Sequence, residues 1–235
     1  GLPPVEPRFE RNIVWRHNPG DPQLRPPAYT FFLSALYFCL GDSQFGVRLV
    51  QMLLGLCSAL LGYSLGRRLY SRGAGLLMTA FMALYWPFII YEASLHEPVL
   101  VIFCSLLFMN AALWWRERPS GSRALCLGGA CGLFTVSSAA IILFLPVLLC
   151  WVAWVLYRSK KRGRDVSGEA SNLERKPKPL EGPFGRGRIF AQAVLVLAGF
   201  FIALSPVTLM NYRESGEFVL NSYGQGITLY IGNQP

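Results

Sequence analysis

Apolar residues in this chain are grouped into long runs, and the charged residues lie between the runs. The hydrocarbon core of a bilayer is about 30 Å thick and a helix rises about 1.5 Å per residue, so a span needs roughly 20 apolar residues. Six runs have about this length. They predict an all-α, polytopic integral membrane protein with six transmembrane helices. The predicted spans are residues 45–66, 73–91, 97–115, 123–138, 139–157 and 189–210.

The segments on either side of the spans have a different character. Residues 1–44 begin polar and rich in proline, and within them the apolar stretch 29–40 is too short to cross a bilayer. We therefore expect an external loop that carries a short interfacial helix over 29–40. Residues 211–235 are expected to start a further external region.

The fourth and fifth predicted spans form one continuous apolar stretch. A tight hairpin near Ser137 and Ser138 divides it into two spans, whereas a single long, tilted helix is the alternative. Pro87, Pro146 and Pro206 lie inside predicted spans, where proline is tolerated and often kinks the helix.

The basic residues predict the orientation of the chain. Of its 22 Lys and Arg residues, the loops 67–72, 116–123 and 158–188 hold three, three and ten, which makes 16. The acidic residues lean the other way, but they contribute little to the positive-inside rule. That rule predicts that these three loops are cytoplasmic. The N-terminal segment, the loop 92–96 and the tail 211–235 then lie outside.

Composition excludes several classes of function. The chain is 53% hydrophobic and 15% charged, whereas a soluble domain is roughly one quarter charged. The net charge of +9 comes from loops between helices and not from a folded basic face, so a bilayer and not a nucleic acid is the expected partner. No phosphate loop, HExxH motif, nucleophile elbow or dinucleotide fingerprint is present, and the six cysteines have no metal-type spacing. We identify no cofactor and no metal-ligand set.

Candidate chemistry is confined to polar residues at the predicted outer ends of the helices. Ionisable groups at membrane depth are costly and indicate function, although snorkelling weakens this argument at the interface. Arg25 and Arg48 are also compatible with simple interfacial anchors. Glu97 precedes Pro98 at a helix start, where the helix dipole favours a carboxylate without any catalytic role.

Several short motifs, in order, carry a family resemblance. Arg25-Pro26-Pro27-Ala28-Tyr29 is followed by a short apolar helix, by Leu40-Gly41-Asp42, by Val47-Arg48-Leu49 and, at the end of the first span, by Gly66-Arg67-Arg68-Leu69-Tyr70. The segments from Tyr91 to Pro98 and from Gly224 to Asn233 continue the series. Over about residues 20–235 the chain resembles the GT-C superfamily of membrane glycosyltransferases. The resemblance is to the branch of protein mannosyltransferases and aminoarabinose transferases, glycosyltransferase family 39.

The resemblance implies a multi-pass glycosyltransferase that moves a hexosyl or pentosyl group from a polyprenyl-phosphate-linked donor to an acceptor on the outer face. The acceptor is a protein, a lipid or a glycan, and the bacterial inner membrane is the expected location. In such enzymes a carboxylate acts as general base and cationic groups stabilise the leaving phosphate. The substrate-binding residues that the resemblance implies are Arg25, Tyr29, Arg48, Glu92 and Glu97.

The chain departs from the family pattern in three places. The first helix of the family is not found, so the catalytic aspartate that follows that helix is expected upstream of Gly1, in a longer protein of which this chain is a fragment that also lacks the C-terminal part. Leu24 stands where some relatives carry an acidic metal ligand, so metal dependence stays open. Ser138 stands where many relatives carry an arginine. Alternatives from other classes are a transporter or channel subunit and a non-catalytic membrane scaffold.

Overall fold

The computed structural model describes residues 27–170, 186–216 and 218–222, and within these ranges it contains helices and no strand. In chain order the helices are α1 (Ala28–Leu40), α2 (Gln44–Leu69), α3 (Arg72–Leu84), α4 (Trp86–Ala93), α5 (Pro98–Glu117), α6 (Gly121–Ser137), the 3-10 helix η1 (Ala139–Phe144), α7 (Leu145–Ala170) and α8 (Arg186–Ser215). The prediction of an all-α fold is confirmed. The short helix expected over 29–40 is α1.

Three helices begin at serine caps that follow short turns. The side chains of Ser43, Ser71 and Ser120 accept hydrogen bonds from backbone N–H groups in the first turns of α2, α3 and α6, at 3.2, 3.2 and 3.4 Å. Each bond satisfies one of the N–H groups that a helix start leaves without a partner. Helix starts are therefore encoded locally, in residues that lie between the apolar runs.

Four helices are long and apolar enough to cross a bilayer, namely Gln44–Leu69, Pro98–Glu117, Ala139–Arg158 and Ile189–Arg213. They correspond to four of the six predicted spans. The other two predicted spans, 73–91 and 123–138, are shorter helices in the structure, so the count of six is not confirmed. With 17 residues, α6 is at the lower end of the range of lengths that spans the hydrocarbon core.

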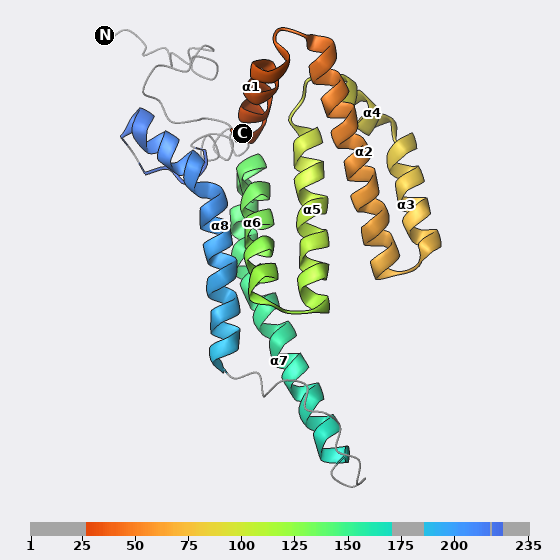
Figure 1. The fold of residues 1–235 in the computed structure, drawn as a ribbon, viewed down its shortest axis with the longest axis vertical. Coiled ribbons are helices and arrows are strands. Elements are labelled where there is room, and N and C mark those ends of the chain that lie inside the picture. Colours follow the sequence, from red (N-terminus) through yellow and green to blue (C-terminus); the bar gives the residue numbers. More distant parts are fainter. Residues whose placement is uncertain (1–26, 171–185, 217, 223–235) are drawn as a thin grey trace, which may run out of the picture.

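The predicted span 73–91 is not one helix. It is divided into α3 and α4 at Tyr85, whose backbone is extended. Pro87 explains the break, because it has no N–H to donate to the carbonyl four residues earlier and its ring clashes with that carbonyl. The break after α6 follows the hairpin alternative: Ser138 is extended, and α6 and α7 run in opposite directions (Figure 1).

The turns lie at two opposite ends of the bundle (Figure 1). The α2–α3 and α5–α6 turns, the C-terminal part of α7 and the start of α8 share one end, here called the basic end. The other end, called the α1 end, holds α1, the α4–α5 turn and the C-terminal part of α8. The first 13 residues of the predicted loop 158–188 are helical as part of α7, and residues 171–185 lie outside the described part.

The closest packing in the bundle is between α6 and α8. A Cβ atom on Gly128 would overlap the carbonyl oxygen of Val196, and one on Gly199 would overlap that of Leu125. One turn further, a Cβ on Gly132 would lie 2.6 Å from the Cβ of Ala203. Small residues at such positions let two membrane helices approach until their backbones touch, which strengthens van der Waals packing between them. Around this contact α5, α6, α7 and α8 form the buried core, whose fully buried side chains include Trp115, Leu127, Val152, Leu156, Val196 and Phe200.

Adding one methyl group at this contact is expected to destabilise the protein. Gly128→Ala should lower the free energy of unfolding by about 1–3 kcal/mol, because overpacking forces the two backbones apart. Gly129→Ala is the matched control, since its Cβ would meet the nearest atom of α8 at 3.9 Å, an ordinary contact. Thermal unfolding of both variants in detergent measures the difference. Equal midpoints for Gly128→Ala and the wild type would contradict the assigned contact.

Candidate functional site

A polar cluster joins three helices at the α1 end. Tyr29 lies in the first turn of α1 and is half-buried, and Gln51 lies in α2 and is completely buried. The side-chain amide of Gln51 donates a hydrogen bond from Nε2 to the hydroxyl oxygen of Tyr29 at 3.2 Å. Glu97, at the start of α5, interacts electrostatically with the same hydroxyl group. Tyr29 and Glu97, two of the residues that the sequence singled out, thus lie at the same end of the bundle, within electrostatic range of each other.

The environment of Tyr29 keeps its hydroxyl protonated. Burial raises the pKa of Tyr29 above its usual value, the hydrogen bond from Gln51 opposes that rise, and nearby Tyr37 and the negative charge of Glu97 add to it. A protonated phenol can donate a hydrogen bond, so this side chain can bind an anionic oxygen such as that of a phosphate.

Of the other candidate residues, the structure describes the side chain of Arg48 but not those of Glu92 and Arg25. Arg48 is exposed near the start of α2, at the same end as Tyr29. Glu92 belongs to α4, and its side chain lies outside what the structure describes. Arg25 also lies outside the described residues, two positions before the completely buried Pro27. Its proposed contact with a phosphate stays a prediction.

The catalytic aspartate is a further residue that the structure does not place. Its location is expected from the family resemblance alone, and the described part of the chain begins only at Pro27. The location of the catalytic base before Gly1 stays a prediction.

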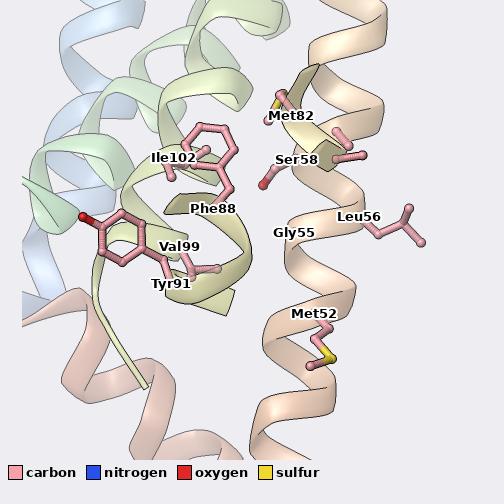
Figure 2. A pocket seen from close by; sticks show the side chains of 11 residues that line it. Met52, Gly55, Leu56, Ser58, Met82, Phe88, Tyr91, Val99 and Ile102 are labelled. Carbon is pink, nitrogen blue, oxygen red and sulfur yellow. The ribbon is translucent and has the colours of Figure 1, made fainter. Parts of the chain in front are cut away.

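An apolar chamber of about 220 Å³ lies between α2, α3, α4 and α5. On α2 it begins at Met52, beside Gln51, and continues one turn on at Gly55. Figure 2 shows the side chain of Ser58 pointing into the space, while that of Leu56 points away. Phe88 and Tyr91 border the chamber from α4, which lies there because Pro87 breaks the preceding helix.

A second polar group fixes the segment that follows α8. Asn211 donates to the backbone oxygens of Val219 and Asn221 at 3.1 and 3.0 Å, and Thr208 donates to that of Leu220 at 2.9 Å. Asn221 in turn donates to the backbone oxygen of Thr135, in the last turn of α6, at 2.6 Å. These bonds hold residues 219–221 against the α1 end of both α6 and α8. Ser138 begins the neighbouring turn.

Sequence reasoning missed the buried amides. It placed candidate chemistry only at the outer ends of the helices, whereas Gln51, Asn110, Gln192 and Asn211 are buried in helices of the bundle. The available signal was a single amide inside an otherwise apolar run, which is costly in a membrane unless it is bonded. Among the described residues, no group of three or more His, Cys, Asp or Glu side chains could hold a metal ion.

Fold and site together define a helical membrane protein with a polar cluster at one end of the bundle and an apolar chamber beside it. Residues 24–164, more than half of the chain, match the model of the dolichyl-phosphate-mannose-protein mannosyltransferase family. The chain belongs to this family of membrane glycosyltransferases, which confirms the resemblance drawn from the motifs. The match favours a glycosyltransferase over a transporter, a channel or a scaffold. No curated protein and no solved structure matches the chain.

The proximity of Glu97 to Tyr29 gives a testable expectation. Removing the carboxylate charge with Glu97→Gln should lower the pKa of Tyr29, because the negative charge disfavours the tyrosinate form. The measurement is a pH titration of ¹³C-labelled tyrosine by NMR, with Tyr29→Phe to assign the signal. Glu117→Gln, which removes an exposed carboxylate at the basic end, is the control and should leave the titration of Tyr29 unchanged. If Glu97→Gln leaves the pKa of Tyr29 unchanged, the charge of Glu97 does not act on Tyr29 and the assigned interaction is wrong.

Proposed function

We propose that the protein transfers a sugar, hexosyl or pentosyl, from a polyprenyl-phosphate-linked donor to an acceptor at the α1 end of the bundle. The observation that carries the proposal is the family match over residues 24–164, because this range includes α1, Gln51 and Glu97. An acceptor hydroxyl attacks the anomeric carbon, the bond from that carbon to the phosphate oxygen breaks, and the polyprenyl phosphate leaves. A base, expected in the full-length protein upstream of Gly1, takes the proton of the acceptor hydroxyl.

The residues of the α1 end suit the two parts of such a donor. Arg25, Tyr29 and Arg48 supply hydrogen-bond donors for the phosphate, and an arginine fork can bind two phosphate oxygens at once. Glu92 and Glu97 are the candidate acids beside the sugar or the acceptor. The chamber beside Gln51 suits the hydrocarbon part of a lipid, since most of the side chains that line it are apolar.

The proposed orientation places the α1 end outside the membrane and the basic end in the cytoplasm of a bacterial inner membrane. Six arginines of the two turns at the basic end support it, namely Arg67, Arg68, Arg72, Arg116, Arg118 and Arg123. Some of them are also structural. Arg68 forms an ion pair with Glu117 at 3.4 Å, and Arg123 donates to the backbone oxygen of Trp114 at 2.9 Å.

Cysteine labelling tests this orientation. After the six native cysteines have been replaced, cysteines introduced at Ser71 and Ser120 should react with a membrane-impermeant reagent only from the cytoplasm. A cysteine at Ser94, in the α4–α5 turn, should react only from outside. Intact cells compared with inverted vesicles give the measurement, and permeabilised cells give the control for reactivity. External labelling at Ser71 or Ser120 would reverse the proposed orientation.

Arg25 tests the binding of the donor phosphate. Arg25→Ala should remove charge-assisted hydrogen bonds of about 1.5–3 kcal/mol and weaken donor use about ten- to a hundredfold. Arg25→Lys should restore only part, because an ammonium group lacks the planar fork. Arg72→Ala, at the basic end, is the control. Sugar transfer from polyprenyl-phosphate donors by the full-length protein in liposomes is measured. Unchanged turnover and donor affinity in folded Arg25→Ala would leave Arg25 as an anchor only.

A further inference from the structure

Gln51 is a polar residue in an unusual place. It is completely buried in α2, and among the described residues its one side-chain partner is the hydroxyl group of Tyr29. Its Oε1 atom has no hydrogen-bond partner in the described part of the chain. A buried amide with an unpaired oxygen is less favourable than an apolar side chain of the same size. Stability therefore gives no reason for a glutamine at this position.

The unpaired oxygen is not peculiar to Gln51, because the buried Oδ1 of Asn110 also has no hydrogen-bond partner in the described part of the chain, but the other buried amides differ from Gln51 in what they bond to. Asn110 donates to the backbone oxygens of Leu61 and Leu106, and Gln192 accepts a hydrogen bond from the indole of Trp115 at 2.9 Å. These bonds join α5 to α2 and to α8, all three of which are long enough to span the membrane. Gln51 instead reaches α1, the short helix that follows the Arg25-Pro26-Pro27 motif. Its bond therefore acts on the candidate site and not on the packing of the spans.

The direction of this bond decides what the tyrosine can do. With Nε2 of Gln51 as the donor, the oxygen of Tyr29 is the acceptor, and the hydrogen of the phenol is left to donate elsewhere. Among the described residues, the hydroxyl of Tyr37 and the carboxylate of Glu97 are the ionisable groups that act on Tyr29. Both oppose formation of tyrosinate, so the phenol keeps the hydrogen that a phosphate oxygen can accept.

We propose that Gln51 is a positioning residue, which holds the hydroxyl of Tyr29 so that it donates a hydrogen bond to the phosphate of a lipid-linked substrate. This inference rests on the proposed function. It assigns a role to a residue that touches no reacting atom itself. The ligand class is a polyprenyl phosphate, with or without its sugar, because the phenol contacts only the phosphate.

Kinetics of the full-length protein in liposomes test the proposal. Gln51→Met keeps the length of the side chain and removes the hydrogen bond, and Tyr29→Phe removes the hydroxyl. Each should raise the KM for the polyprenyl-phosphate-linked donor about three- to tenfold with little change in kcat, which is the range for one hydrogen bond. The double variant should be no worse than either single variant, because both remove the same interaction.

Gln192→Met is the matched control. Gln192 is also a buried glutamine with a hydrogen bond to one side chain, the indole of Trp115, but it lies at the basic end of the bundle. The variant should lower thermal stability and leave the KM for the donor unchanged. A KM that Gln51→Met does not alter, or effects of Gln51→Met and Tyr29→Phe that multiply in the double variant, would overturn the positioning role.

A measurement without substrate separates this inference from the proposed function. Loss of the bond from Gln51 should raise the pKa of Tyr29 further, because that bond favours tyrosinate. If Gln51→Met raises this pKa but the wild type transfers no sugar from any polyprenyl-phosphate donor, the proposed function fails and the contact stands. If transfer occurs and the pKa of Tyr29 is unchanged in Gln51→Met, the positioning role alone fails.

Discussion

The backbone contact between α6 and α8 is the constraint on which the rest of the structure depends. Lipid tails are as apolar as the side chains of a membrane helix, so burial of apolar surface gives little drive for helices to associate. Close packing between helices therefore has to supply the stabilisation, and Gly128 and Gly199 allow the backbones of α6 and α8 to approach closely. α6, with 17 residues, is at the lower end of the range of lengths that spans the hydrocarbon core. Its close contact with α8 therefore fixes its position, and with it the turn at Ser138 and the bonded segment 219–221.

Prolines show how far the sequence predicts this fold and where it stops. Pro87 and Pro206 were both interpreted as kinks inside spans, yet only α8 continues through its proline. In α8 the hydroxyl of Ser205 donates at 2.9 Å to the carbonyl of Ile202, the group that an N–H at position 206 would have satisfied. The chain at Pro87 divides into α3 and α4 instead. Apolar periodicity predicts neither outcome, because the difference lies in which group satisfies one freed carbonyl.

The candidate site was only partly predictable for a similar reason. Motif order pointed to Tyr29 and Glu97, which lie 68 positions apart in the sequence and within electrostatic range of each other at the α1 end. Motifs could not indicate Gln51, because a glutamine inside an apolar run has no characteristic spacing. Its meaning depends on a partner from another helix, and the pairing exists only after α1 has packed against α2. The motifs thus indicated that the candidate site lies at the α1 end. Only the packing of α1 against α2 indicated Gln51, the residue that we propose orients Tyr29.

The two ends of the molecule differ in how their arginines are placed. At the basic end the described arginines contact Glu117, Trp114 and Trp154 or face the solvent, so their charge is available to orient the chain but is partly occupied by neighbours. At the α1 end the described arginines are few, and Arg48 is exposed. Under the proposed function, the hydroxyl of Tyr29, oriented by the buried amide of Gln51, would add a directed hydrogen-bond donor to the charge that Arg48 brings to this end.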